Sequence, residues 1–454
     1  NCMSLSRSLF RTLPLTAALA LAFASGAQAQ SLVEMYDAAR GYDAGFISAK
    51  AQFEANLAKA NQTLGGILPN IALSASATRT YFEGRNDNGT AWPISPNPRV
   101  YGTGSGAVVL TQPIYRPTAW ASYRQGGYLL QQAAAQFEAA EQDLLVRVSQ
   151  AYFDVLTSED NLALVQAQKQ AVEEQLASAK RNFEVGTATI TGVRDAQARF
   201  DLTSAQEIAA ENDLRIKRLA LNLAVGLNNA KPKRLASNTK LIAPPSEDVA
   251  TWVTQSETTS PAVRQAQLGL DIAAQEVNKA TAGHKPTIDG QISYSGIRNV
   301  DGSATSPSGS HIFNPSAAIV LNMPIFAGFS TMYRVKETVA LEDKARSDYE
   351  NARRATAQAT RTAYFGLVAG LSQVKAYEAA EASSQSALDA NKLGYSVGVN
   401  INIDVLNSQS QLYQTKRDLA KARYDVLVGN LKLRQAAGTL TPADLQPIND
   451  LLTP

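Results

Sequence analysis

The two halves of this 454-residue chain repeat at a fixed offset, and no other feature constrains the fold as strongly. Gly186 in NFEVGTATITGV and Gly398 in GYSVGVNINIDV differ by 398 − 186 = 212 positions. Gly226 in LAVGLN and Gly438 in QAAGTL give the same offset, 438 − 226 = 212. A period this long does not fit a solenoid of small units. The sequence therefore predicts a duplicated half-molecule.

Composition argues against several classes of protein. The net charge is only +2, which gives no reason to predict a nucleic-acid partner. The single cysteine, Cys2, lies in a presequence, so neither a disulfide nor a thiol nucleophile is expected in the mature chain. With His284 and His311 as its only histidines, the chain lacks the parts for histidine-based metal or triad chemistry. We therefore expect no enzyme, no metal and no cofactor.

Residues 1–29 have the pattern of a secretory signal peptide. Arg7 and Arg11 precede an apolar run, and the small-residue sequence AQA ends at Ala29 as a cleavage site. The run is too short for a transmembrane helix, which needs about 20 apolar residues. Because Cys2 precedes the run, we expect no acyl anchor on the mature protein.

Four segments alternate apolar and polar residues, at about 67–82, 100–115, 286–297 and 315–326. A period of two indicates strands with one apolar and one polar face. Strands of about ten residues with this pattern form the walls of outer-membrane barrels, with aromatic residues near the rims. The aromatic candidates are Tyr81, Phe82, Tyr101 and Tyr294. Taken one at a time, the segments favour a half-buried sheet of a soluble domain instead, but the order of the two halves favours the barrel.

Each half reads strand, polar loop, strand and then a very long helix. Pro113 and Pro324 punctuate the second strand of each half, because proline cannot donate a ladder hydrogen bond. The run 119–185 contains no proline, and its apolar residues follow the three-four spacing of a coiled-coil seam. The seam residues are Leu162, Val165, Val172, Leu176, Ala179 and Phe183, interrupted by Lys169, and in the second half Leu406, Ser410, Tyr413, Arg417, Ala420, Tyr424, Leu427 and Leu431.

Gly186 and Gly398 account for the repeated sharp turn. Glycine readily takes the left-handed conformation that ends helices, so each is predicted to end one long helix before the next begins. The chain should therefore form two helical hairpins, with tips at 185–192 and 396–403. The segment 228–255 contains three prolines and should interrupt the helices between the repeats.

Several motifs occur in order along both repeats: LTQPIY and LNMPIF, AYFDVL and AYFGLV, NFEVGTATITGV and GYSVGVNINIDVLNSQSQLY. Together they resemble the TolC family of outer-membrane efflux and secretion channels, over nearly the whole mature chain. The resemblance implies a mainly α protein with β structure. It implies a homotrimer in which each subunit gives four strands to a twelve-stranded transmembrane barrel, continued by a periplasmic helical coiled-coil barrel. The need for more than one subunit also follows from physical chemistry. Four strands cannot close a barrel, and an open sheet edge cannot face lipid.

The expected organisation follows from the repeat and the resemblance. After the signal peptide come a first repeat at 30–227, a connector at 228–255, a second repeat at 256–438 and a tail at 439–454. The connector and the tail resemble the belt around the middle of the family's tunnel.

The resemblance places a gate at the hairpin tips. Tyr395 matches the family's gate tyrosine, Thr191 matches a threonine beside the gate, and Asp404 matches a carboxylate that lines the entrance. Four other matched positions carry different residues: Gly192 for an aspartate that holds the tyrosine, Asn400 for an arginine, Arg181 for a glutamine and Asn407 for a second carboxylate. The family's own hydrogen-bond lock therefore cannot form here as written.

Asp404 has two interpretations. Asn400, Asp404 and Asn407 have the spacing i, i+4, i+7, which places them on one face of a helix. If that face lines a trimeric tunnel, Asp404 forms a ring of three carboxylates that favours cations. Alternatively, Asp404 is a solvent-exposed carboxylate at the start of a helix, where the helix dipole stabilises its negative charge. Tyr395 could likewise be an ordinary coiled-coil position, since it aligns with Phe183.

The tip turns carry small residues, which the resemblance identifies as docking positions for a periplasmic adaptor, or membrane fusion protein. They are Val185, Gly186, Thr187, Val397, Gly398 and Val399. Ordinary helix capping would need the two glycines but not their neighbours.

These features lead to the hypothesis of a passive exit duct for a tripartite efflux pump, a type I secretion system or both. It would lie in outer-membrane lipid of a Gram-negative bacterium, with its helices in the periplasm and an RND or ABC type inner-membrane transporter supplying energy. The cargo would be drugs or proteins. The alternative is a periplasmic coiled-coil scaffold or adaptor without a pore, and a helical hydrolase is a weaker third.

Overall fold

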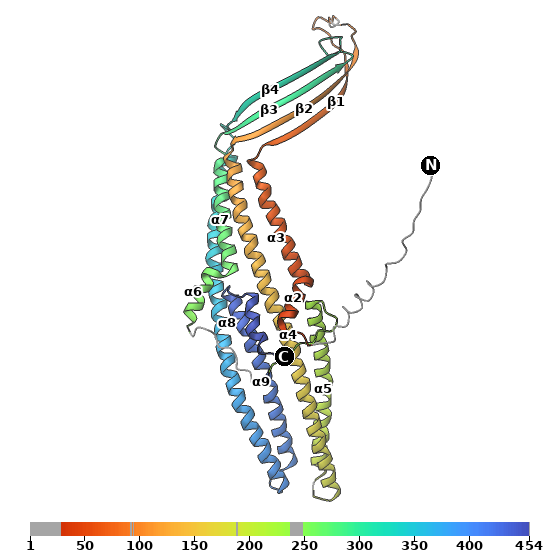
Figure 1. Ribbon diagram of the computed structural model, residues 1–454, viewed down its shortest axis with the longest axis vertical. Coiled ribbons are helices and arrows are strands. Elements are labelled where there is room, and N and C mark those ends of the chain that lie inside the picture. Colours follow the sequence, from red (N-terminus) through yellow and green to blue (C-terminus); the bar gives the residue numbers. More distant parts are fainter. Residues whose placement is uncertain (1–28, 91–92, 94, 188, 237–247, 454) are drawn as a thin grey trace, which may run out of the picture. The chain divides into compact units, whose positions relative to one another are not determined.

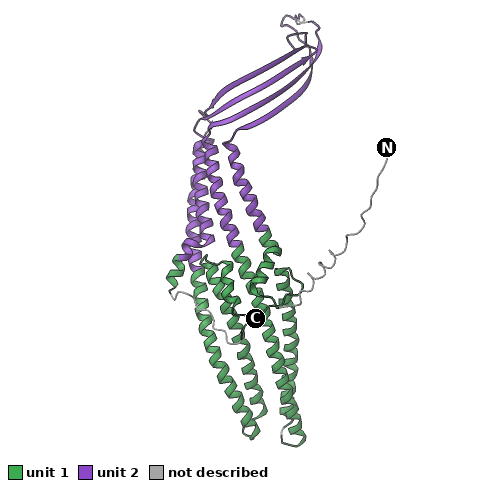
Figure 2. Ribbon diagram, viewed as in Figure 1, with its two compact units in different colours: residues 1–47, 141–254, 359–454 green, residues 48–140, 255–358 purple. Residues whose placement is uncertain are grey.

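Figure 1 shows the computed structural model of the chain, which describes residues 29–90, 93, 95–187, 189–236 and 248–453. The predicted signal peptide therefore lies outside the described residues except for its last position, Ala29. The chain divides into two compact units (Figure 2). Unit 1 comprises residues 1–47, 141–254 and 359–454, and unit 2 comprises residues 48–140 and 255–358.

Unit 2 contains one antiparallel sheet of four strands in the order β1-β2-β3-β4. The strands are β1 (Asn70–Phe82), β2 (Arg99–Tyr115), β3 (Thr287–Val300) and β4 (Ser310–Asn322). Because β2 pairs with β3, the sheet joins the two sequence repeats side by side. The outer sides of β1 and β4, the two edges of the sheet, pair with no further strand among the described residues.

The last strand differs most from its predicted range. The last strand covers Ser310–Asn322 instead of 315–326, because its first residues pair with β3 as far as Ser310. Pairing ends before Pro324, which has no N–H to donate. Strand β2 ends at Tyr115, as its predicted range 100–115 has it, and pairing passes Pro113 with a register shift between these two residues.

The two faces of the sheet differ in polarity. The register places Leu73, Val108 and Tyr294 beside one another, and the same face, here called the apolar face, carries exposed Ile71, Ile292, Ile319 and Leu321. The opposite, polar face carries side-chain hydrogen bonds between strands. These are Ser76 Oγ to Ser105 Oγ at 2.8 Å, Ser293 Oγ to Ser316 Oγ at 2.7 Å and Thr103 Oγ1 to Asn299 Oδ1 at 3.1 Å.

The helices of unit 2 are α7 (Pro261–Ala282) and parts of α3 (Ala44–Gln62), α4 (Pro117–Glu184) and α8 (Ser330–Ser396). Arg116 binds Asp289 of β3 at 2.7 Å, which fixes the start of α4 to the sheet. Glu276 of α7 binds Arg334 of α8 at 2.8 Å. None of the helices within the described ranges has the length and apolar character needed to cross a membrane.

Unit 1 contains two antiparallel helical hairpins, α4–α5 and α8–α9, where α5 is Ile190–Val225 and α9 is Asn402–Ala436 (Figure 1). The prediction that glycines end the long helices is confirmed, with φ of 77° at Gly186 and 79° at Gly398. The carbonyl of Asn182 accepts a hydrogen bond from the Thr187 amide at 2.8 Å, and the second tip has the equivalent bond. Both turns are therefore glycine C-caps.

The predicted seam of α4 is partly right. Val165, Val172, Leu176 and Ala179 are buried, whereas Phe183 is 43% exposed. Lys169 interrupts the seam because its ammonium binds Glu207 of α5 at 2.7 Å.

The sequence analysis missed a second seam on α9. Of the predicted positions, Leu406 packs with Val172 and Leu176, so that stripe faces the α4–α5 hairpin. The partner α8 instead contacts a stripe with strict seven-residue spacing: Val405, Leu412, Leu419, Val426 and Leu433. Helix α9 is thus buried on two sides.

Short segments of unit 1 gather beside these helices. They include α2 (Leu32–Tyr42), the first part of α6 (Val249–Thr259), η2 (Pro442–Leu445) and α10 (Gln446–Asn449). Gln30 pairs with Pro232, and Leu235 pairs with Leu452, so the connector contacts both ends of the described chain. Residues 237–247 of the predicted connector lie outside the described residues, and its last part is helical from Val249.

Candidate functional site

The tips of the two hairpins enclose a cleft of about 760 Å³, here called the tip cleft. Its walls come from α4, α5, α8 and α9, all within unit 1. Four predicted gate residues line it: Tyr395, Thr191, Gly192 and Asn400. The other three, Asp404, Asn407 and Arg181, do not.

Tyr395 connects the end of α8 to the other hairpin. Its hydroxyl accepts a hydrogen bond from Asn182 Nδ2 of α4 at 3.2 Å. Its ring packs beside Leu388 and Val405 of its own hairpin. The hydrogen-bond partner of the Tyr395 hydroxyl is therefore Asn182, while Gly192 contributes only backbone atoms to the cleft.

Asn402, which the sequence analysis did not single out, contacts both helices of the other hairpin. It is 8% exposed. Its Oδ1 accepts a hydrogen bond from Gln175 Nε2 of α4, and its Nδ2 donates to the Gly192 carbonyl of α5 at 3.4 Å. The seam pattern gave no signal for it, because the alternating steps of three and four residues, extended back from Leu406, reach Ile403 and not Asn402.

A hydrogen-bond chain runs inside the α8–α9 hairpin. Asn400 Nδ2 donates to Asn391 Oδ1 at 2.7 Å, and Asn391 Nδ2 donates to Ser408 Oγ at 2.6 Å. The Ser408 hydroxyl then donates to the Asp404 carbonyl at 2.9 Å. Gly394 makes room for this chain, since a Cβ there would lie 2.6 Å from Asn400 Nδ2.

The shared helix face predicted for Asn400, Asp404 and Asn407 is wrong for its first member. Helix α9 begins at Asn402, so Asn400 lies in the turn before it. Asp404 Oδ2 accepts a hydrogen bond from the Ile401 amide at 3.2 Å, as a helix-capping carboxylate does. In a complete capping box the N-cap side chain would also accept a hydrogen bond from the backbone. The side chain of Ile401 has no acceptor atom, so only one of the two bonds forms.

Asn407 and Arg181 have exposed side chains that do not line the tip cleft. Asn407 Oδ1 accepts a hydrogen bond from Arg199 Nη2 of α5 at 2.7 Å, which makes a further link between the hairpins. Arg181 is exposed, and its guanidinium has no ion pair or hydrogen bond to any described residue.

The predicted docking positions form two exposed apolar tips. Val185 is 72% exposed, Val397 65% and Val399 79%. Thr187 and Gly398 also line the tip cleft. Leu393 and Ile401 are also exposed, at 65% and 64%, so the second tip carries a group of apolar side chains in contact with water.

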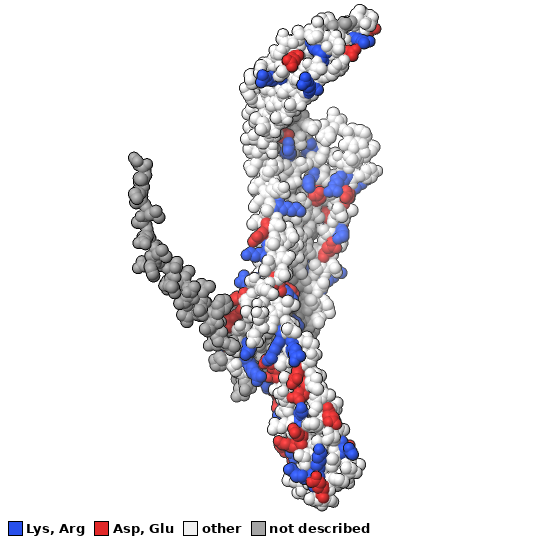
Figure 3. Space-filling view, turned by 90° about the vertical axis from the view of Figure 1, so that its right-hand side faces the viewer, with Lys and Arg blue, Asp and Glu red and all other residues white. Residues whose placement is uncertain are grey.

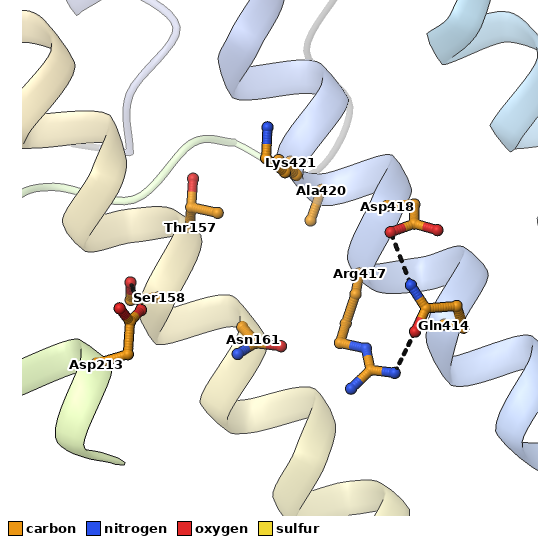
Figure 4. Close-up of a pocket in the computed structure, with 9 residues that line it drawn as sticks. All are labelled: Thr157, Ser158, Asn161, Asp213, Gln414, Arg417, Asp418, Ala420 and Lys421. Carbon is orange, nitrogen blue, oxygen red and sulfur yellow. Dashed lines mark hydrogen bonds between the residues drawn. The ribbon is translucent and has the colours of Figure 1, made fainter. Parts of the chain in front are cut away.

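A second cleft, of about 330 Å³, lies between α4, α5 and α9 (Figure 4). Ser158 Oγ donates to Asp213 Oδ2 at 2.7 Å, and Arg417 donates to Gln414 at 2.5 Å. No histidine lines this cleft, so its serine and aspartate do not form a hydrolytic triad.

Among the described residues no cluster of three or more His, Cys, Asp or Glu could hold a metal. Positively and negatively charged side chains are interspersed along the helices of unit 1 (Figure 3).

A buried polar contact fixes α9 to α4 within unit 1. The Tyr424 hydroxyl donates to Asp160 Oδ2 at 2.7 Å, and the Tyr424 ring lies 5.7 Å from that of Phe153 between centroids. Burial raises the pKa of the Asp160 carboxyl above its ordinary value, against the opposing effect of the Tyr424 hydrogen bond. The contact also raises the pKa of Tyr424, chiefly through burial.

Comparisons with known proteins agree with this architecture. The family model described as "Outer membrane efflux protein" matches residues 16–227 and 252–439. The chain is 32% identical to the outer membrane protein TolC of Vibrio cholerae, over 97% of this chain and 98% of that one. It is 28% identical to the alkaline protease secretion protein AprF of Pseudomonas aeruginosa, over 74% of this chain and 70% of that one.

Solved structures show the same fold. The CmeC outer membrane channel of Campylobacter jejuni has a TM-score of 0.76 at 15% identity, covering 100% of this chain and 98% of that one. The predicted fold class is confirmed: mainly α, with four antiparallel strands per chain. The family model and the 32% identical relative together identify the chain as a member of the outer membrane efflux protein family, the TolC family of outer-membrane channels.

Proposed function

We propose that the protein is a passive exit duct whose barrel crosses the outer membrane as a homotrimer. One observation carries the proposal: the sheet has a hydrogen-bonded polar face, an apolar face and two unpaired edges among the described strands. An unpaired edge cannot face lipid, so β1 of one copy must pair with β4 of the next. Three copies would give twelve strands, with the polar face around the lumen and the apolar face toward lipid.

The tip cleft is the proposed gate. Near the tips, four side-chain contacts join the hairpins of one protomer: Asn182 to Tyr395, Gln175 to Asn402, Asn402 to the Gly192 carbonyl, and Arg199 to Asn407. Moving the α8–α9 hairpin away from α4–α5 would break all four. In the trimer, three Asp404 carboxylates near the entrance would form a cation-favouring ring.

The exposed valines at the tips support the proposed partner surface. An adaptor hairpin could bury Val185, Val397 and Val399 and pull the tips apart. An inner-membrane transporter would then supply the energy. AprF is named as a protease secretion protein, and the family model as an efflux protein, so we propose that the cargo is either small molecules or proteins.

A dye-efflux assay tests this function. In cells that lack their own outer-membrane channel but contain adaptor and pump, the wild-type chain should restore efflux. The double substitution Val397→Asp and Val399→Asp should abolish efflux at unchanged outer-membrane levels, because two charges would have to be buried against the adaptor. Gln373→Asp is the matched control, at an exposed position of helix α8, which leads into the turn that carries the two valines.

Failure of the wild-type chain to restore efflux, although folded trimers are present in the outer membrane, would reject the duct. Recovery of the protein in the soluble periplasmic fraction would instead favour a scaffold without a pore.

A further inference from the structure

The apolar face of the sheet is not apolar throughout, because it ends in three side chains that can carry positive charge. Arg298 of β3 lies directly opposite His311 of β4, and Arg298 also pairs with Gly104 of β2. Arg79 of β1 lies on the same face, two residues beyond the Ala77 that pairs with Gly104. All three side chains are exposed, and none has an ion pair or side-chain hydrogen bond to a described residue. We call Arg79, Arg298 and His311 the cationic rim.

No acidic side chain balances the cationic rim on its own face. Within the four described strands the only Asp or Glu is Asp289, and it lies on the polar face, where it binds Arg116. Arg99, the remaining charged strand residue, pairs with Phe82 and also lies on the polar face. The rim therefore has uncompensated positive charge that points away from the protein.

The position of the rim along the strands fits the boundary of a bilayer. From Ile288, at the helix end of β3, to Arg298 is 298 − 288 = 10 residues. At about 3.3 Å per residue and a tilt of about 40°, this distance is about 25 Å along the membrane normal, the height of a barrel's apolar band. The rim lies at the loop end of the sheet, so on the proposed function it reaches the headgroups of the outer leaflet.

A surface without side chains lies between the cations. Gly102, Gly104 and Gly106 occupy successive positions of β2 on the apolar face, between Arg79 and Arg298. A Cβ built at each glycine would have its nearest neighbouring atom at 3.8, 3.9 and 4.0 Å respectively, which is ordinary contact. Packing within the chain therefore does not require glycine there. Glycine within a strand also marks places where a ligand approaches closely.

We propose that the cationic rim and these glycines bind a phosphorylated lipid of the outer leaflet. Arg79 and Arg298 bind the phosphate, since guanidinium groups pair with phosphate through two parallel hydrogen bonds. His311 donates a further hydrogen bond. The lipid's apolar part lies on Gly102, Gly104 and Gly106, where no side chain holds it away. A trimer has three such sites. This inference rests on the proposed barrel and its orientation.

Native mass spectrometry of purified trimers in detergent can measure this binding. The probes are bisphosphorylated lipid A and the same lipid after enzymatic removal of its phosphates. The wild type should retain the phosphorylated form at least tenfold more strongly. The double variant R79Q/R298Q should lose that preference. R85Q is the matched control, because Arg85 lies in the loop that follows β1 and binds Glu83 at 2.9 Å.

A second variant separates shape from charge. Gly104→Leu leaves both arginines in place and covers the glycine surface, so retention of phosphorylated lipid should again fall. Equal retention of both lipids by the wild type, or an unchanged preference in R79Q/R298Q, would overturn the proposal. Complete displacement by millimolar inorganic phosphate would also overturn it, because the site would then bind an ion and not a lipid.

Single-channel conductance, recorded on the same preparations, keeps the two proposals distinguishable. Conducting trimers without lipid preference would reject the lipid site alone. Folded trimers that never conduct would reject the duct on which the site's orientation depends.

Discussion

Replacing Asn402 by alanine should weaken the closed tip more than any other single removal of a side chain there. Asn402 is buried and bridges to both helices of the other hairpin, through Gln175 and the Gly192 carbonyl. Each hydrogen bond contributes about 1 kcal/mol net, so the substitution should cost the closed arrangement about 2 kcal/mol per protomer. Because 1.4 kcal/mol is a factor of ten, the ratio of open to closed tips should rise roughly 30-fold.

Single-channel recording of purified trimers in planar bilayers measures this shift. The Asn402→Ala protein should spend a much larger fraction of time in high-conductance states than the wild type. Gln411→Ala is the matched control, because Gln411 is exposed on the same helix and bonds only to Thr415 of that helix, at 3.4 Å. It should conduct like the wild type.

A double-mutant cycle makes the interpretation sharper. Gln175→Ala should open the channel less than Asn402→Ala, since the Gly192 contact survives. Combining both substitutions should add little to Asn402→Ala alone, because the two residues share one bond. Wild-type conductance of Asn402→Ala, in trimers that remain folded, would refute the idea that this side chain holds the tip.

Three further predictions concern stability, each measured as the urea midpoint of the trimer. Gly186→Ala should destabilise the trimer by about 1–2 kcal/mol, because φ at Gly186 is 77°. The control Gly41→Ala, within helix α2, should stabilise it slightly. Equal effects of the two substitutions would contradict the left-handed turn at Gly186. Gly226→Ala should destabilise more than Gly186→Ala, since the Tyr42 ring occupies the space of its Cβ, and a smaller effect would contradict that contact. Asp160→Asn should stabilise at pH 7.5, and its advantage should shrink on acidification. The reason is that burial raises the folded-state pKa of Asp160, so the cost of its charge is present above that pKa and disappears as pH falls toward the ordinary value of 3.8. An advantage that is unchanged at pH 4 would contradict this reasoning.

Local chemistry made part of the fold predictable from the sequence. The hairpin turns depend on the conformational freedom of Gly186 and Gly398, which is a property of the residue itself. The strands followed from their period of two, because one face of each is mainly apolar in its helix-side part. The end of β4 was less certain, since pairing with β3, not the position of Pro324, decides where the strand lies.

Tertiary contacts explain what the sequence did not reveal. Gln175 and Asn402 are 227 positions apart, and only the packing of two hairpins brings them together. The second seam of α9 was missed because Val405 and Leu412 lie one position before Leu406 and Tyr413, so the two stripes overlap in the pattern. The turn position of Asn400 depends on where α9 begins, which spacing alone did not fix.

The most direct test of the duct is the conductance of the wild-type protein itself, purified without its signal peptide. Recorded with and without millimolar divalent cations, the trimers should show small, cation-selective steps that divalent cations block. Asp404→Ala should relieve the block, because it would remove the proposed ring of carboxylates at the entrance. Folded trimers that show no conducting events would contradict the channel function outright.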